Sequence, residues 1–146
     1  MTRLRVYVDI DAPPARVWAA VRDIASHPRW MHDAVAIRFV TPQREGVGTT
    51  FDCDTKVGPF RLVDRMEVVE WKPRRAMGIT HAGTVSGRGR FVLQPRRFGR
   101  RTRFVWDERL RFPVWFGGPI GSAIARAVLR RIWRRNLANL KRLVEG

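Results

Sequence analysis

Residues 119–144 read PIGSAIARAVLRRIWRRNLANLKRLV, and this stretch decides the fold of the 146-residue chain. Gly118 and Pro119 form a helix start signal, a conformationally permissive residue followed by proline at the first helical position. No Pro or Gly follows Gly121 until Gly146, so the sequence predicts one long helix. At about 1.5 Å per residue this helix spans about 39 Å, which is enough to cross a small domain.

The two halves of this helix differ in side-chain size. When positions advance by about 100° per residue, the second half has an almost wholly apolar arc. The arc consists of Leu129, Ile132, Trp133, Asn136, Leu137, Leu140, Leu143 and Val144. In the first half the same arc holds only Gly121, Ser122 and Ala125. A helix that is bulky at one end and small at the other, laid on a sheet, is predicted to leave a cavity beneath its small end.

The residues before the long helix predict a strand, two short helices and six further strands. Alternating apolar residues predict the first strand over residues 3–10, and helical spacing predicts a short helix near 11–23. The turn-rich segment 27–32 is expected to form a second short helix. The later strands are expected over 34–40, 49–57, 60–71, 75–81, 87–94 and 102–112. Short turns between them favour an antiparallel meander, with the lone helix on its concave face. The prediction is one α+β domain over residues 1–146, with a curved sheet wrapped on the C-terminal helix in a helix-grip fold.

Composition and missing motifs narrow the possible functions. Cys53 is the only cysteine, so no internal disulfide can form, and paired Cys and His ligands at zinc spacing are missing. We therefore expect a reducing, cytoplasmic setting and no metal. The sequence has no signal-peptide run and no apolar stretch long enough for a membrane span. It also has no nucleophile elbow, phosphate-binding glycine loop or Cys-x-x-Cys motif, and no cofactor is expected.

The run IDAPPARVWAAVRDIASHPRW at residues 10–30 resembles the opening of the START-like superfamily, also called SRPBCC, and particularly its polyketide cyclase/dehydrase branch. The strand start at 46–51, the run VVEWKP at 68–73 and the basic C-terminal helix fit the same family, so the resemblance covers essentially the whole chain. It implies a deep apolar cavity between sheet and long helix. Ligands and reactions vary widely within the superfamily, and no catalytic residue of a cyclase matches a position here.

Residues predicted to face inward are the candidate ligand-binding residues. The sheet would contribute Phe51, Cys53, Leu62, Met66, Phe91, Trp106 and Leu110, and the helix Ser122, Ala125 and Leu129. Gly87 and Gly89 alternate on one strand and remove side-chain volume from one face. For any one of these residues a packed core is the better interpretation, but the small face of the helix favours a cavity for the set as a whole.

Three ionisable residues join this set as candidate catalytic or ligand-binding residues. Asp64 and Glu108 each interrupt an apolar strand face, where a carboxylate must be hydrogen-bonded, paired or protonated. We expect each to pair with one of the many arginines; the functional alternative is an anchor for a ligand hydroxyl or ketone, or acid/base chemistry. His81, at the end of its strand, is the histidine expected to face inward, with a surface position as the ordinary alternative.

The net charge of +16 comes mostly from arginine. Five arginines crowd one hairpin turn, namely Arg96, Arg97, Arg100, Arg101 and Arg103. Residues 112–125 carry no charge and include Trp115 and Phe116, which suits a lid or an interfacial patch. Such a surface attracts acidic partners, and a polybasic face beside an apolar patch fits an anionic membrane better than nucleic acid.

Three interpretations of function follow from these features. The first is binding, or transport, of a hydrophobic or aromatic small molecule in the cavity under the helix. The second is a polyketide cyclase/aromatase-like enzyme in which Asp64, Glu108 or His81 supplies acid/base chemistry. The third is an interaction protein whose arginine-rich face binds a membrane, nucleic acid or another protein.

Overall fold

The computed structural model describes residues 1–146 and has the predicted order of elements. The chain starts with β1 (Thr2–Ile10), α1 (Pro14–Val21) and the short 3-10 helix η1 (Ile24–Arg29). Six strands follow: β2 (Ala34–Phe39), β3 (Thr50–Val57), β4 (Phe60–Lys72), β5 (Ala76–Ala82), β6 (Ser86–Arg96) and β7 (Arg101–Arg111). A short turn of 3-10 helix, η2 (Val114–Phe116), leads into α2 (Gly118–Glu145). Only η2 was absent from the prediction.

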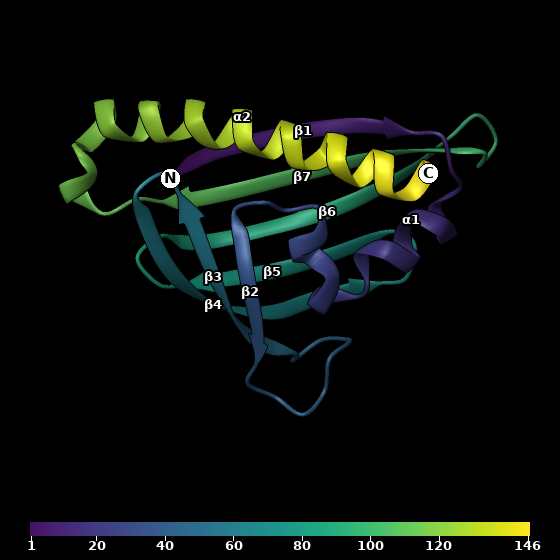
Figure 1. Ribbon diagram of the computed structural model, residues 1–146, viewed down its shortest axis with the longest axis horizontal. Helices are drawn as coiled ribbons and strands as arrows, with labels where there is room; N and C mark the ends of the chain where they lie inside the picture. The colour runs from purple at the N-terminus through teal and green to yellow at the C-terminus, as the bar shows by residue number, and fades with distance from the viewer.

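All seven strands form one antiparallel sheet in the order β1-β7-β6-β5-β4-β3-β2. Strands β2 to β7 are therefore a meander, and β1 pairs with the last strand. The register shifts between Ala34 and Ala36 in β2 and between Val68 and Glu70 in β4. Such bulges bend a strand, and the sheet in Figure 1 curves beneath α2, with α1 near the C-terminal end of the long helix. The α+β helix-grip prediction is confirmed.

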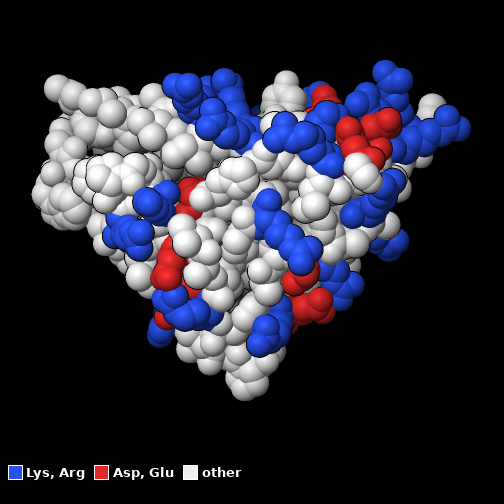
Figure 2. Space-filling view, in the orientation of Figure 1, with Lys and Arg blue, Asp and Glu red and all other residues white.

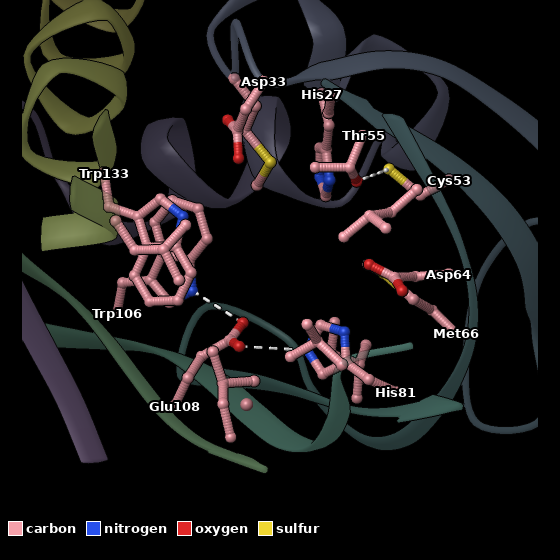
Figure 3. Close-up of a pocket in the computed structure, with 18 of the residues that line it drawn as sticks. His27, Asp33, Cys53, Thr55, Asp64, Met66, His81, Trp106, Glu108 and Trp133 are labelled. Atoms are coloured by element: carbon pink, nitrogen blue, oxygen red, sulfur yellow. Dashed lines mark hydrogen bonds and ion pairs between the residues drawn. The ribbon is translucent and has the colours of Figure 1, made fainter. Parts of the chain in front are cut away.

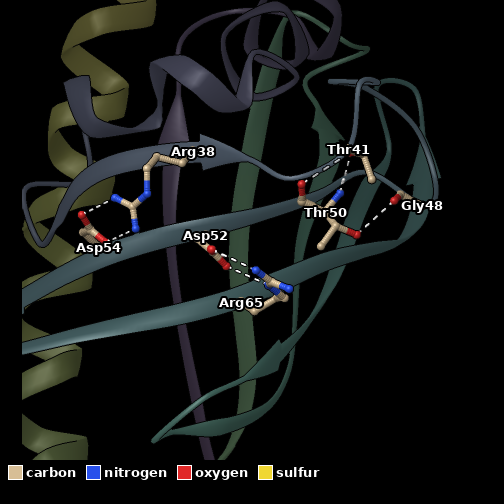
Figure 4. A network of polar contacts seen from close by, with 7 residues as sticks. All are labelled: Arg38, Thr41, Gly48, Thr50, Asp52, Asp54 and Arg65. Carbon is tan, nitrogen blue, oxygen red and sulfur yellow. Dashed lines mark hydrogen bonds and ion pairs between the residues drawn. The ribbon is translucent and has the colours of Figure 1, made fainter.

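Ion pairs on the outer surface show which residues of β3 face inward. Arg38 donates to both oxygens of Asp54 at 2.5 and 2.8 Å, and Arg65 donates to both oxygens of Asp52 at 2.9 and 3.1 Å (Figure 4). These pairs are largely solvent-exposed and add little stability. Successive side chains of a strand point to opposite faces, so Cys53, between the two aspartates, points inside.

Aromatic rings join the layers of the core. Trp30, just after η1, is fully buried. Its ring lies 5.9 Å from that of Phe91, 6.3 Å from that of Phe104 and 6.2 Å from that of Trp106, measured between centroids. Trp106 of β7 also stacks on Trp133 of α2 at 4.4 Å with only 10° between the planes. The helix is thus held to the sheet at the middle of its length, and this contact borders the candidate site.

The long helix begins one residue before the predicted Pro119. Its second half buries the predicted apolar arc through Trp133, Asn136, Leu137, Leu140 and Val144. Leu143, which the sequence places in that arc, is instead about half exposed at its edge. No helix in the structure combines the length and hydrophobicity needed to cross a bilayer.

Candidate functional site

A cavity of about 130 Å³ lies between the concave face of the sheet and α2 (Figure 3). Every strand except β1 contributes to its lining, together with η1 and α2. Because 16 of the 24 lining residues are hydrophobic, its wall is mainly apolar. Several lining residues keep partial solvent exposure, among them Val57, Leu62, Val85 and Leu129, so the cavity is not fully closed.

Eleven of the candidate residues lie in this one wall. They are Phe51, Cys53, Leu62, Asp64, Met66, His81, Phe91, Trp106, Glu108, Leu110 and Leu129. Ten of them come from strands, where the period of two assigns a face without knowledge of the helix position. Their contact with a ligand stays a prediction.

Ser122 and Ala125 do not line the cavity, so its expected position beneath the small end of α2 is wrong. The helix contributes Leu129 and Trp133 from its middle instead. Of the small residues, Gly121 allows a close backbone contact between α2 and η2. Arg126 Nε donates to the backbone oxygen of Arg3 in β1 at 2.9 Å. At Gly121 a Cβ would lie only 1.8 Å from the backbone oxygen of Phe116 in η2.

Glu108 and His81 form a buried ion pair in the wall. Their side chains are 4% and 8% exposed, and His81 Nε2 lies 3.1 Å from Glu108 Oε2. Trp106 Nε1 donates to the other oxygen, Oε1, at 3.0 Å. Burial alone would lower the pKa of His81, but the charge and hydrogen bond of Glu108 raise it above its ordinary value. Gly89 on the adjacent strand makes room for this carboxylate, because a Cβ there would lie 2.6 Å from Glu108 Cδ.

Asp64 is the second inward carboxylate, and it is 8% exposed. Its Oδ1 is buried and has no hydrogen-bond partner. Burial raises the pKa of this carboxyl, the positive charge of His81 opposes the rise, and Glu108 adds to it.

The expected arginine pairs of Asp64 and Glu108 are both absent, and that expectation was wrong. The arginines of these strands occupy outward positions and pair with outward carboxylates, as Arg65 does with Asp52. The same alternation that turns Asp64 inward turns its neighbour Arg65 outward.

A third carboxylate in the wall, Asp33, was missed by the sequence analysis. Asn136 Nδ2 of α2 donates to Asp33 Oδ1 at 2.6 Å, and the backbone N–H of His32 donates to Asn136 Oδ1 at 3.1 Å. Burial raises the pKa of Asp33, and the hydrogen bond from Asn136 opposes this. Asp33 lies outside any periodic element, but Asn136 interrupts an apolar helix face and must find a polar partner. That interruption was the available signal.

Two further polar residues complete the lining. His81 faces inward, although a surface position was the commoner expectation, and His27 also faces the cavity, with its Nε2 2.7 Å from the backbone oxygen of Val21. Burial lowers the pKa of His27 to about 4. Burial also raises the pKa of the Cys53 thiol to about 11. No group of three or more His, Cys, Asp or Glu side chains is arranged to hold a metal ion.

A curved sheet wrapped on a long helix, with an apolar cavity between them, defines a helix-grip fold with a ligand-binding cavity. Residues 1–145 match the family described as polyketide cyclase / dehydrase and lipid transport. The chain therefore belongs to this family. A search of curated protein sequences finds no match.

Solved structures agree with the fold. A protein from Thermus thermophilus superposes with a TM-score of 0.81 at 19% identity, covering 98% of this chain and 97% of that chain. The Zhui aromatase/cyclase from a Streptomyces species superposes with a TM-score of 0.78 at 16% identity, covering 99% of this chain and 93% of that chain. A START superfamily protein from Mycobacterium smegmatis superposes with a TM-score of 0.74 at 15% identity, covering 97% of this chain and 98% of that chain. At these identities the likeness concerns the fold alone.

Proposed function

We propose that this protein binds and carries a hydrophobic or aromatic small molecule in the cavity between the sheet and α2. The observation that carries the proposal is the apolar wall around an unfilled space. At about 24 cal/mol per Å³, a cavity of about 130 Å³ costs about 3 kcal/mol of stability. This is a large fraction of the stability of a small domain, and a ligand that fills the space would recover much of it.

The volume of the cavity limits the size of the buried group. An engineered protein cavity of about 150 Å³ lined by apolar side chains accepts benzene. The present cavity is similar in size and therefore suits one aromatic ring, with larger ligands extending past the partly exposed lining residues Leu62 and Leu129. Ring-sized ligands have few atoms, so their dissociation constants are expected between about 1 mM and 1 µM.

Two adjacent positions on β4 provide a matched test. Leu62 lines the cavity, whereas Val63 points away from it and is exposed. Uptake of an apolar fluorescent probe should fall strongly in Leu62→Trp, because the larger ring occupies the ligand space, and should persist in Val63→Trp. Thermal unfolding of both variants checks that they fold. Equal uptake by the two variants would locate probe binding outside this cavity.

The His81 and Glu108 pair favours a second candidate, an enzyme of the polyketide cyclase/dehydrase kind. Glu108 holds Nε2 of the imidazole, which leaves Nδ1 as the ring nitrogen available to a ligand. A carboxylate that fixes the imidazole in this way is a recurrent arrangement for general acid/base catalysis. The charge and hydrogen bond of Glu108 raise the pKa of His81, which favours the protonated imidazole as a proton donor.

Dehydration of a β-hydroxy ketone is the simplest reaction for this pair. His81 Nδ1 would take a proton from the carbon between the carbonyl and the hydroxyl-bearing carbon, and the hydroxyl would leave as water with a proton returned by the imidazolium. The products are a conjugated enone and water, so no oxidant or reductant is needed. Such acid/base catalysis contributes about 10²- to 10⁴-fold to a rate.

The aldol adduct of benzaldehyde and acetone is a ring-sized substrate for this test, because its dehydration product absorbs in the ultraviolet. Dehydration faster than in buffer, lost in both His81→Asn and Glu108→Gln, would favour the enzyme. His32→Asn is the control, since His32 is exposed and lies outside the cavity wall. Probe uptake without any acceleration would leave binding as the function.

A further inference from the structure

The charge of the cavity wall is opposite in sign to that of the whole protein. Its acidic groups are Asp33, Asp64 and Glu108. His81 is the lining histidine whose pKa is raised and which therefore favours the positively charged form. Arg90 also borders the cavity, but its guanidinium points to the outer surface and donates to Glu70 at 2.9 Å. A protein with a net charge of +16 thus encloses a cavity with more acidic than basic groups.

Among the carboxylates of this wall, only Asp64 has a buried oxygen atom without a hydrogen-bond donor. Both oxygens of Glu108 have partners, one in Trp106 and one in His81. Asp33 is held by Asn136. Asp64 is more than nine-tenths buried, and its Oδ1 has no donor. Figure 3 shows its carboxylate on the wall between Cys53 and His81, directed toward the cavity. A buried carboxylate without a donor is unfavourable, so a ligand that supplies one is favoured.

We infer that the cavity selects ring-containing molecules that are neutral or cationic and carry an O–H or N–H donor, that Asp64 anchors this donor, and that carboxylate ligands are excluded. This inference rests on the proposed binding function and names its ligand class. A hydrogen bond to a buried charged acceptor is expected to tighten binding about tenfold to a hundredfold. A ligand carboxylate would face the three carboxyl groups of the wall in a medium of low polarity, and the one imidazole that could pair with it, His81, is already paired with Glu108.

Four probes of similar size separate these effects: toluene, phenol, benzylamine and benzoate. Dissociation constants are measured by NMR titration of the intact protein at neutral pH. Phenol and benzylamine are expected to bind about tenfold or more tightly than toluene. Benzoate is expected to bind more weakly than toluene, although the surface charge attracts anions. Benzoate binding as tight as that of toluene would overturn the inference. If none of the four binds, the proposed binding function itself fails.

Variants at Asp64 test the anchor. Asp64→Leu should retain toluene binding and lose the preference for phenol, while Asp64→Asn should lose the preference for benzylamine and tolerate benzoate better. Asp52→Asn removes the same charge from the outer face of the neighbouring strand and should change none of these ratios. The measured quantity is the ratio of the dissociation constants of two probes on the same variant. A change in the stability of the variant affects both constants alike and leaves this ratio unchanged. An unchanged phenol preference in Asp64→Leu would refute the anchoring role.

An exposed apolar surface carries a second, independent inference. Five apolar side chains of η2 and the first half of α2 face solvent: Val114, Trp115, Ile120, Ile124 and Val128. We call this set the apolar end. Trp115 is 68% and Ile120 75% exposed. In Figure 2 the corresponding left end of the molecule shows no charged side chain. Large exposed apolar patches mark interaction surfaces.

Basic residues adjoin the apolar end along the same helix. Arg126 lies between Ile124 and Val128, while Arg130, Arg131, Arg134 and Arg135 follow, and no acidic residue of the helix precedes Glu145. Figure 2 shows blue side chains along this part of the surface. Leu129, which follows the apolar end directly, lines the cavity on its partly exposed side. The apolar end, the basic residues and the cavity therefore meet at the middle of α2.

We propose that this face docks on an anionic lipid bilayer, with the apolar end inserted and the arginines on lipid headgroups. Stable attachment needs two signals, and both are present here. Charge complementarity favours this partner over a second copy of the chain, because two copies would bring their arginines together.

Co-sedimentation with vesicles tests the docking surface. Binding is expected to vesicles of phosphatidylcholine mixed with phosphatidylglycerol, to weaken with rising salt, and to be weak with phosphatidylcholine alone. Trp115→Ala should lower the bound fraction several-fold. Phe98→Ala is the control, because Phe98 is fully exposed but lies on the arginine-rich hairpin instead of the apolar end. No binding to anionic vesicles at low salt, an equal effect of Phe98→Ala, or self-association through Trp115 in light scattering would each overturn the proposal.

Discussion

Protonation of His27 should make this protein lose stability on mild acidification. The ring is buried against Trp30 and Phe91, with centroids 5.4 and 6.1 Å away, and its Nε2 contacts the backbone oxygen of Val21 at 2.7 Å. The neutral ring donates its N–H to this oxygen. The protonated ring would place a charge among apolar side chains, and burial therefore lowers its pKa to about 4.

The sign and size of the effect follow from linkage. Between the folded pKa of about 4 and the unfolded value of 6.5, the unfolded chain binds the extra proton, so stability falls as pH falls. The full difference corresponds to about 3 kcal/mol, of which about 2.5 kcal/mol is lost between pH 7 and pH 4.5. This is a substantial part of the stability of a domain of this size.

Urea unfolding at several pH values between 7 and 4.5 measures the effect, and His27→Gln removes the titrating group while keeping an N–H donor for Val21. The free energy of unfolding of wild type should fall by about 2 to 3 kcal/mol more than that of the variant. A constant offset from altered packing does not change this slope. His32→Gln, at an exposed histidine, should keep the wild-type slope. An equal pH dependence of the free energy of unfolding in wild type and His27→Gln would show that His27 is not the group responsible.

Three further predictions concern the cavity wall. In Glu108→Gln the pKa of His81, followed by NMR, should fall from above to below its ordinary value. The reason is that the imidazole stays buried but loses the negative charge of Glu108, which raises its pKa. An unchanged pKa would contradict the ion pair. Gly89→Ala should displace the Glu108 carboxylate and cost about 1–3 kcal/mol in urea unfolding, and a neutral effect would contradict this packing. Cys53 should react slowly with iodoacetamide at pH 8 in the folded protein and rapidly in urea, because burial raises the pKa of its thiol to about 11; equal rates would place the thiol in solvent.

Period-two alternation explains why most of the sheet and its inner face could be predicted. It assigned Phe51, Cys53, Asp64 and Glu108 to the inside, and the structure places them there. Alternation is a local property of the chain, so it needs no knowledge of the tertiary structure. The position of the cavity along the helix required more information, since the small size of Ser122 does not show which part of α2 covers the cavity.

The polar partners within the site depend on contacts distant in sequence. The sequence shows that Asp64 and Glu108 are unusual, but the choice between arginine and His81 as partner depends on the register of β4 and β5 and on the outward direction of the arginines. Asp33 and His27 lie in a turn and a short 3-10 helix, where no regular period assigns a direction to the side chain. Their positions follow only from the packing of these segments against the sheet.

The methionines offer the most direct test of the central claim that the cavity binds a ring-sized molecule. Met31, Met66 and Met77 line the cavity, whereas Met1 is 72% exposed and serves as an internal control. Protein labelled with ¹³C at the methionine methyl groups is titrated with phenol and followed by NMR. Binding in the cavity should produce saturable shifts of the three cavity methyl signals and leave that of Met1 unchanged. Cavity signals that stay constant up to millimolar phenol, or that move no more than Met1, would contradict it.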